Sequence, residues 1–428
     1  MGGVPAHGVA ADDRAEFLLV IGVNENRRFH GHFPTGQLCG SVAQPPAHLN
    51  CGYYHKQGVY VQGNTARVWC LLGRKAGDNT QVLALARALG WGYEEKHILA
   101  QPWELFVHLG SGATLAGIDR AASSTLQAPW PDLVLSAGRR NEPVAQWIRA
   151  QSGGHSALVH FGRPWAPLDA WDLIITTPQY FLPRQDNIVH NQLPLHDLAR
   201  EQLRPEGEAL RARLRDLPRP WIALLVGGDS GRFVLTADKG ARLGRLADTL
   251  AQRSGGALLV ADSPRTPRAA SDALRAALDK AHFSYRWGDP GDNPYRGMLA
   301  QADAFVVTGE SMSMLGEATA MGRPVFIFDP GDGDTPWWRL RHNYRYKPLS
   351  HRLAMAWGPA RMRRDVGNIQ SALVADGRAR WLREDLLEGA ALDLQHAAPS
   401  RAPVVADADL QRATHAVQAL LREKLGQP

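Results

Sequence analysis

The sequence predicts an α/β protein built from two doubly wound domains that face a cleft. Its 428 residues exceed what one hydrophobic core usually supports. Short apolar runs alternate with amphipathic segments, and the alternation starts again after a charged, proline-containing stretch at 197–220. Parallel sheets require this order, because the crossover between parallel strands is usually a helix. We therefore expect ligands outside the carboxyl ends of the strands.

The first domain is expected over residues 67–196. Its opening unit has a buried-strand run at 68–72, a turn-rich loop at 73–79 and a helix at 80–89 that Gly90 ends. The same pattern recurs further along, and its expected parts are a strand at 132–136, a loop at 138–141, a helix at 142–151 and strands at 157–161 and 172–177.

The second domain is expected over residues 221–395. A strand at 221–226 is followed by a glycine-rich loop at 227–232 and by a helix that Thr236 caps. The next expected elements are a strand at 257–261, a loop at 262–267, a helix at 269–281 and a helix start at Asn293 and Pro294. A strand then ends near Thr308, and a helix begins near Ser311.

The remaining segments have other characters. Residues 1–66 contain scattered Gly, Pro, His and Asn without a sustained period, so they form a poorly patterned N-terminal extension. Residues 197–220 are charged and contain three prolines but no apolar strand, which is typical of a linker. Residues 396–428 are expected to form a C-terminal tail and helix.

Composition indicates a soluble protein of a reducing compartment. The apolar run at 17–23 is too short to span a bilayer, and acidic residues precede it where a signal peptide would be basic. The three cysteines have no metal-ligand spacing and cannot all pair. We expect a cytoplasmic location. The formal charge of +6 is modest for this length and selects no partner class by itself.

Two glutamates stand between the apolar runs of residues 304–328. With a helix beginning near Ser311, Glu310, Ser313 or Met314, and Glu317 fall about one turn apart on one face. Helix-start N–H groups bind phosphate, and a carboxylate further along accepts hydrogen bonds from ribose hydroxyls. The alternative is a solvated acid near a helix N-terminus, where the helix dipole favours it.

Residues 227–231, Gly-Gly-Asp-Ser-Gly, fit a phosphate-binding turn, with Arg232 able to neutralise a diphosphate. The Gly-Lys-Ser/Thr ending of ATP-hydrolysing loops is missing, which disfavours ATP hydrolysis. A purely structural glycine turn is the alternative.

These stretches also carry a resemblance to a known family. Residues 73–81 (GRKAGDNTQ), 131–140 (PDLVLSAGRR), 227–230 (GGDS) and 308–314 (TGESMSM) resemble, in this order, the mitochondrial fission factor family of the elongated-mitochondria type. Its bacterial members are regarded as glycosyltransferases. The resemblance covers roughly residues 67–330, and 1–66 have no counterpart in it.

The resemblance implies two Rossmann-like domains facing a cleft, a GT-B-like fold, with the nucleotide-sugar donor on the second domain and the acceptor on the first. It implies that Glu317 holds the donor ribose. The expected donor-binding residues follow the strands of the second domain: Gly227, Gly228, Ser230, Arg232, Ser263, Arg265, Thr308, Glu310, Ser311, Ser313, Met314 and Glu317.

On the acceptor side, sugar transfer with inversion needs a base that takes the acceptor proton. Asp78 is the candidate, although the same residue could simply cap the helix. The other expected acceptor-side residues lie in the same two loops: Lys75, Asn79, Arg139, Arg140 and Asn141. Arg139 and Arg140 suit donor phosphates or an anionic acceptor, or are solvated loop charges.

Residues 335–364 combine eight Lys or Arg with interleaved Trp and Tyr and contain no acid. This pattern suits peripheral attachment to an anionic inner-membrane surface, with an ordinary surface loop as the alternative. No nucleic-acid-binding motif is present, so no nucleic-acid partner is expected. Neither a metal nor a cofactor is expected, since the nucleotide sugar would be the substrate.

The sequence therefore predicts an inverting, metal-independent glycosyltransferase that moves a sugar from a nucleotide-sugar donor to a cell-surface glycan or a lipid-linked acceptor. Two alternatives stay open. One is a non-catalytic protein of the same family that binds membranes or partners, and the other is a nucleotide-sugar epimerase on the same fold.

Overall fold

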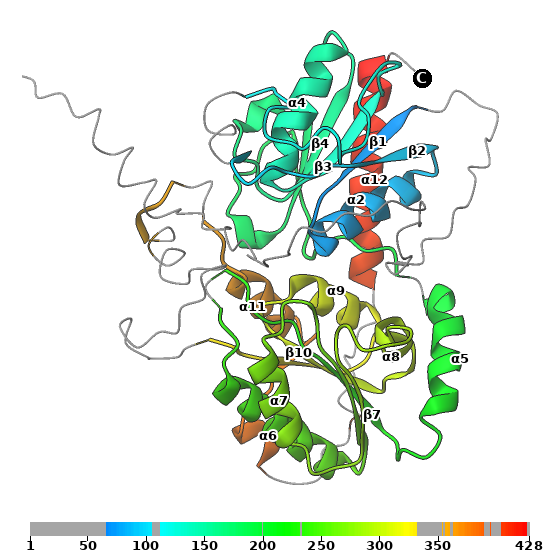
Figure 1. The fold of residues 1–428 in the computed structure, drawn as a ribbon, viewed down its shortest axis with the longest axis vertical. Coiled ribbons are helices and arrows are strands. Elements are labelled where there is room, and N and C mark those ends of the chain that lie inside the picture. Colours follow the sequence, from blue (N-terminus) through cyan, green and yellow to red (C-terminus); the bar gives the residue numbers. More distant parts are fainter. Residues whose placement is uncertain are drawn as a thin grey trace, which may run out of the picture. The chain divides into compact units, whose positions relative to one another are not determined.

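The computed structural model describes residues 66–104, 112–198, 200–231, 233–331, 353, 356–359, 363–388, 394 and 404–425. These residues form two parallel six-stranded sheets with helices on both faces of each, shown in Figure 1. The predicted fold class, α/β with two Rossmann-like domains, is confirmed.

The N-terminal sheet has the strand order β2-β1-β3-β4-β5-β6. All its neighbours pair in parallel. Its strands are β1 (Val68–Leu72), β2 (Tyr93–His97), β3 (Leu133–Ala137), β4 (Ala157–Phe161), β5 (Leu173–Thr176) and β6 (Ile188–His190). Helix α2 (Ala76–Leu89) packs on one face and α4 (Glu142–Gln151) on the other. Short 3₁₀ turns follow three strands: η1 (Arg139–Asn141), η2 (Leu168–Ala170) and η3 (Pro178–Tyr180).

The C-terminal sheet has the strand order β12-β11-β10-β7-β8-β9 and is also parallel throughout. Its strands are β7 (Trp221–Leu225), β8 (Ala257–Ala261), β9 (His282–Tyr285), β10 (Ala304–Thr308), β11 (Val325–Phe328) and β12 (Arg380–Trp381). Because β7, β8, β10 and β11 are buried on both faces, they read in the sequence as continuous apolar runs.

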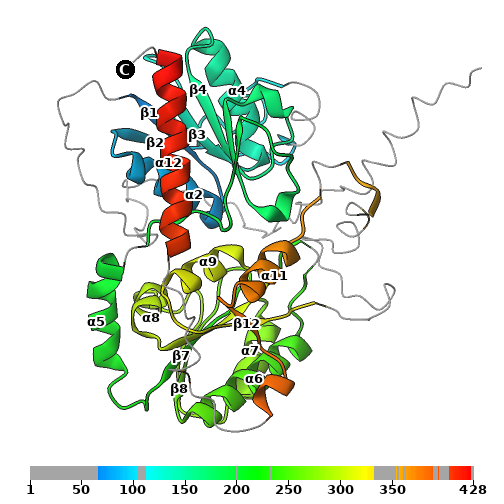
Figure 2. The ribbon, with the colours of Figure 1, turned by 180° about the vertical axis from the view of Figure 1, so that it is seen from behind.

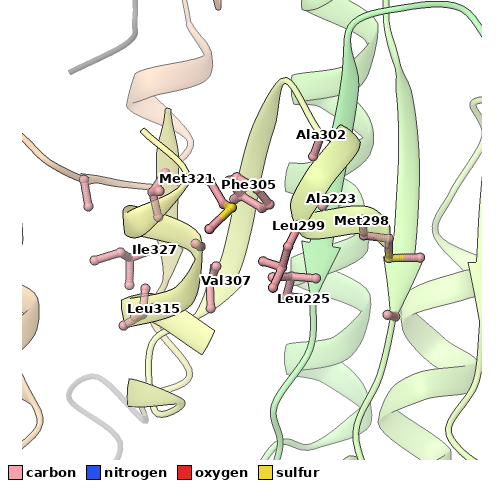
Figure 3. Packing of buried hydrophobic residues seen from close by; sticks show 14 of the residues in the cluster. Ala223, Leu225, Met298, Leu299, Ala302, Phe305, Val307, Leu315, Met321 and Ile327 are labelled. Carbon is pink, nitrogen blue, oxygen red and sulfur yellow. The ribbon is translucent and has the colours of Figure 1, made fainter. Parts of the chain in front are cut away.

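Helices cover both faces of this second sheet. On one face lie α6 (Ala237–Ser254) and α7 (Arg268–Ala276). On the other lie α8 (Tyr295–Gln301), α9 (Met312–Ala320) and α11 (Gly367–Ala375). Figure 3 shows this second face, where Leu299 of α8 and Leu315 of α9 pack against strand residues such as Val307. The 3₁₀ turn η7 (Asp385–Leu387) follows β12.

The expected linker contains ordered helix. After the turn η4 (Arg200–Leu203) comes α5 (Arg204–Arg213), which packs against α8. Leu203, Leu210 and Leu214 are buried, and their spacing of seven and four residues places them on one helical face. The charged residues between them conceal this apolar stripe in the sequence.

The C-terminal helix α12 (Val404–Leu425) returns to the N-terminal sheet. Its residues Ala413, Val417 and Leu421 are buried in the same core as α2, and Figure 2 shows α12 in red beside α2. Asp409 of α12 accepts hydrogen bonds from the N–H groups of Gln192 (2.8 Å) and Leu193 (3.0 Å), which lie beyond β6. Among the helices of the described residues, none combines the length and the apolar character needed to cross a bilayer.

Candidate functional site

The predicted polar loops lie at the point where each sheet reverses its strand order. In the C-terminal sheet, β7 lies between β8 and β10, and the helices that follow β7 and β10 cover opposite faces. In the N-terminal sheet, β1 and β3 stand in the same relation, with α2 and α4 on opposite faces. Ligands of open α/β sheets bind at such switch points. The geometry therefore marks residues 227–230 and 308–317 in one half, and 73–79 and 138–141 in the other.

The glycine loop after β7 is closed by side chains that follow β10. The N–H of Gly227 donates to Thr308 Oγ1 (2.8 Å), and the N–H of Gly228 donates to Glu310 Oε1 (2.6 Å). A Cβ at Gly227 would lie 1.9 Å from Glu310 Oε1, and a Cβ at Gly228, where φ is +136°, would lie 2.2 Å from Arg265 O. Close packing of protein groups thus accounts for both glycines.

Glu310 is a buried carboxylate at the centre of this loop cluster. Only 2% of the residue is exposed, and its Oε2 has no hydrogen-bond partner among the described residues. Burial raises the pKa of Glu310, while Arg265 and the Gly228 N–H act in the opposite direction. Arg265 Nη2 lies 3.8 Å from Glu310 Oε1 and 3.4 Å from Ser311 Oγ. The sequence predicted that Glu310 and Glu317 share one helical face. This is wrong, because Glu310 precedes α9 and faces the glycine loop.

Ser263 and Thr266 join the loop after β8 to the same cluster. Both hydroxyls donate to the Gly227 carbonyl, Thr266 Oγ1 at 2.6 Å. Arg265 Nη1 donates to Asp229 O (3.2 Å), and the Ser230 N–H donates to Phe233 O (3.0 Å). The structure thus brings most of the expected donor-side residues together.

The N-terminus of α9 points three N–H groups, those of Met312, Ser313 and Met314, beyond the helix, since they have no intrahelical acceptor. Ser311 is the N-cap residue, and its side chain accepts no capping bond. A Cβ added at Gly77 would lie 2.7 Å from Ser313 Oγ, so the first turns of α2 and α9 meet within the unit Ala66–Pro428. Met314 packs partly buried against the core under α9.

Glu317 lies one turn further along α9 and faces α8. Its Oε2 accepts a hydrogen bond from the Tyr295 hydroxyl. Burial is the largest influence and raises the pKa of Glu317 to about 7, against the lowering effects of the Tyr295 hydrogen bond and of Arg296. Close to neutral pH this carboxyl group therefore changes its protonation state.

Helix α2 begins earlier than expected, at Ala76 rather than Thr80, so part of the expected acceptor-side loop belongs to the helix. Asn79 closes the preceding turn: its Oδ1 accepts from the Gly73 N–H (2.9 Å), and its Nδ2 donates to Gly73 O (2.8 Å). Asp78 lies in the first turn of α2, 3.7 Å from the exposed Lys75 Nζ. A Cβ at Gly138 would lie 2.8 Å from Asp78 Oδ2, so Asp78 also borders the second loop.

The second loop turns its two arginines toward a carboxylate. Glu104 Oε1 accepts from Arg139 Nη2 (2.7 Å) and from Arg140 Nε (3.0 Å), and the Arg139 guanidinium lies 4.9 Å from the centre of the Trp165 ring. Burial lowers the pKa of Arg139. Asn141 is buried, and its Nδ2 donates to the carbonyls of Leu71 and Ala137, so it joins β1 to β3.

Some expected positions lie outside the described residues. Arg232 is one, and so is most of the basic segment 335–364, of which residues 353, 356–359 and 363–364 are described. Within the described residues, no three His, Cys, Asp or Glu side chains gather as a metal site, and the metal-free reaction stays a prediction.

Sequence reasoning missed Glu104, Tyr295 and Thr266. Glu104 lies far along the chain from the arginines that it pairs with, and nothing in its neighbourhood signals this. Tyr295 directly follows the proline of a helix start, and a tyrosine on an inward helical face carries a hydroxyl that needs a partner. Thr266 could have been found, since Ser and Thr in a strand–loop–helix connection commonly bond to loop backbone.

The fold and the loops define a protein with two Rossmann-like domains and polar clusters at both switch points. The chain belongs to the mitochondrial fission ELM1 family, whose model matches residues 76–385, well over half of the chain. The mitochondrial fission protein ELM1 of Arabidopsis thaliana is 27% identical over 261 residues, which cover 55% of this chain and 61% of that protein. The protein RP120 of Rickettsia prowazekii (strain Madrid E) is 24% identical over 306 residues, covering 61% of this chain and 83% of its own length.

Among solved structures, a UDP-GlcNAc 2-epimerase from Neisseria meningitidis bound to UDP-GlcNAc is 12% identical, with a TM-score of 0.42, over 82% of this chain and 100% of that one. MurG of Acinetobacter baumannii is also 12% identical, with a TM-score of 0.39, over 84% of this chain and 99% of that one. The fold assignment above rests on the strand order of this chain itself.

Proposed function

We propose that the protein is a glycosyltransferase that moves a sugar from a nucleotide-sugar donor to a glycan or lipid-linked acceptor. One observation carries the proposal: the switch point between β7 and β10 combines an uncapped N-terminus of α9 with a guanidinium, Arg265, 3.4 Å from the cap residue Ser311. A helix N-terminus and an arginine together favour a diphosphate.

The donor nucleoside would extend along α9 toward Glu317. This carboxylate is one helical turn beyond Met314, a spacing that suits a ribose joined to a diphosphate at the helix start. Tyr295 already donates to Glu317 Oε2, so Oε1 is the oxygen left for a ribose hydroxyl.

The acceptor would lie against the α2 loop, with Asp78 as the base. The contact between Gly77 and Ser313 brings the residue next to Asp78 to the first turn of α9, where the donor diphosphate would lie. A sugar bound beside this contact would have a carboxylate on one side and the diphosphate leaving group on the other. Inverting transfer needs this arrangement, because the base and the leaving group act on opposite faces of the sugar.

A specific observation favours the non-catalytic alternative. The sequence predicts that this loop binds a phosphate. In this conformation, however, the N–H groups of Gly227 and Gly228 both donate to side chains and are not available to a phosphate. A protein that keeps the fold and binds partners or membranes would retain such a closed loop. The epimerase alternative shares the donor site and differs in needing no acceptor.

Release of free nucleotide from a panel of nucleotide sugars, with and without acceptor, separates these functions. A transferase releases nucleotide with acceptor present, an epimerase changes the sugar without it, and a non-catalytic protein does neither. Asp78→Asn should lower the transfer rate at least a hundredfold, since general-base catalysis contributes roughly 10²–10⁴-fold. Asp169→Asn, an exposed aspartate on η2, is the matched control. An active Asp78→Asn variant would remove Asp78 from the mechanism.

The proposal also includes a location. We place the protein in the cytoplasm, with the basic and aromatic segment 335–364 attaching it peripherally to an anionic inner-membrane surface. In support, Trp357 is 81% exposed, and interfacial tryptophans contribute to such attachment.

A further inference from the structure

A second arginine cluster lies at the carboxyl ends of β4 and β5, outside the residues considered so far. Arg163, two residues after β4, donates through Nη1 to the carbonyls of Tyr180 (2.5 Å) and Phe181 (3.4 Å), next to η3. Phe181 is half exposed and has a φ of +54°. A bulky residue rarely adopts this left-handed conformation, and such residues concentrate at functional sites.

The residues leading into α11 contact the same turn. Arg364 Nε donates to Gln179 Oε1 (2.8 Å), the Asp365 N–H donates to Gln179 O (2.8 Å), and Asn368 Nδ2 donates to Pro178 O (3.1 Å). These bonds fix the backbone beside Arg363, whose side chain is exposed. Its one hydrogen bond within the described residues is from Nε to Gly358 O (3.1 Å).

Arg163 and the residue after Arg363 bind the same turn, residues 179–181, and no hydrogen bond between described residues joins Arg163 or Arg363 to a carboxylate. Burial lowers the pKa of Arg163, and the positive charge of Arg363 lowers it further. In the described part of the chain, Arg163 Nε is buried without a hydrogen-bond partner, and its other bonds go to uncharged carbonyls.

The contrast with Arg139 and Arg140 is informative. Those two arginines share Glu104 and are partly neutralised within the protein. Within the described residues, the printed bonds of Arg163 and Arg363 go to carbonyl oxygens and not to a carboxylate, so an anion placed between the two guanidinium groups would relieve their mutual repulsion. Arginine is the residue best suited to this task, because its planar fork binds phosphate oxygens in pairs.

We propose that Arg163 and Arg363 bind a phosphate group of the acceptor, with the exposed ring of Phe181 contacting the group that carries the phosphate. This inference rests on the proposed glycosyltransferase function and names its acceptor class, a phosphate ester. The ester comes either from a lipid phosphate or from a sugar phosphate, since both present the same charged group.

Calorimetric titration of the full chain with farnesyl phosphate and with glucose 1-phosphate tests the inference, with farnesol and glucose as the uncharged counterparts. We expect a phosphorylated probe to bind at least tenfold more tightly than its counterpart. Arg163→Gln and Arg363→Gln should each weaken its binding about tenfold, because each removes a charge-assisted contact. Tighter binding of farnesyl phosphate identifies a lipid acceptor, and tighter binding of glucose 1-phosphate a sugar phosphate.

Arg245→Gln is the matched control, because it removes the same charge from an exposed position on α6. Arg163 also supports the η3 turn, so Arg363→Gln carries the test if Arg163→Gln does not fold. Equal binding of charged and uncharged probes, or unchanged affinity in the folded arginine variants, would overturn the inference. Nucleotide release is scored separately: release with a neutral acceptor and no phosphate binding rejects this inference alone. Phosphate binding without release leaves the phosphate site in place but rejects the transferase and, with it, the acceptor role of that site.

Discussion

Glu310 and Glu317 are seven residues apart and belong to different surroundings. Glu310 reaches back to the N–H of Gly228, whereas Glu317 accepts a hydrogen bond from the Tyr295 hydroxyl on α8. Both carboxyl groups have raised pKa values because both are buried. The sequence identified both glutamates as unusual between apolar strands. It did not reveal their partners, because Gly228 and Tyr295 approach them only through the fold.

Glu317→Gln should change how stability depends on pH. The folded pKa of Glu317 is about 7, above the ordinary value of 4.5, so the folded state binds more protons than the unfolded state between these values. The stability of the wild type should therefore fall, relative to the variant, as the pH rises from about 5 to 8. The difference is up to about 3 kcal/mol. Urea unfolding of both proteins at the two pH values measures it.

Glu208→Gln serves as the control for this measurement, because Glu208 is exposed on α5 and pairs with Arg204 across one helical turn. Its pH dependence should match that of the wild type. If Glu317→Gln also keeps the wild-type dependence, Glu317 titrates as an ordinary carboxylate, and its burial has no effect on its charge.

At the scale of elements, the glycine loop after β7 depends on the residues after β10. Thr308 and Glu310 accept hydrogen bonds from the N–H groups of Gly227 and Gly228, and they also fill the space beside Gly227. The loop, β10 and the N-terminus of α9 therefore form one cluster, and a ligand at α9 would be held by a scaffold that is already rigid. Such support is what precise binding requires.

Gly227→Ala should destabilise the protein without any ligand present. The added methyl group would lie 1.9 Å from Glu310 Oε1 and about 3.0 Å from Thr308 Oγ1, so the buried cluster must move. We expect a loss of about 3 kcal/mol in the free energy of unfolding. Gly92→Ala is the control, because nothing lies within 4 Å of a Cβ there. Equal stability of the two variants in urea would show that the space beside Gly227 is not closely packed and is open to a ligand.

The elements with a strong apolar pattern could be predicted and the others could not. Strands β1, β4, β7 and β8 are buried on both faces, and their sequence runs place them within a residue or two. Strand β2 (YEEKH) was missed because it is an edge strand with polar side chains, one of which, Lys96, lies over the Trp69 ring. Helix α5 was missed because its apolar stripe is narrow.

At the scale of the whole unit Ala66–Pro428, residues that are far apart in the sequence make contacts between the two halves. Helix α12 follows the C-terminal sheet but completes the core of the N-terminal one, and Asp409 binds the backbone of residues 192 and 193. The start of α11 binds η3. The sequence predicted a C-terminal helix but not its packing, since a helical stripe does not specify which sheet it covers.

The central claim is that the switch point between β7 and β10 binds a nucleotide sugar. Calorimetric titration of the wild type, Arg265→Gln and the control Arg245→Gln with a panel of nucleotide sugars tests it most directly. We predict that at least one donor binds the wild type and the control alike, and that Arg265→Gln weakens its binding about tenfold or more, because a charge-assisted contact to the diphosphate is lost. Binding of no nucleotide sugar, or equal affinity in Arg265→Gln, would contradict the claim.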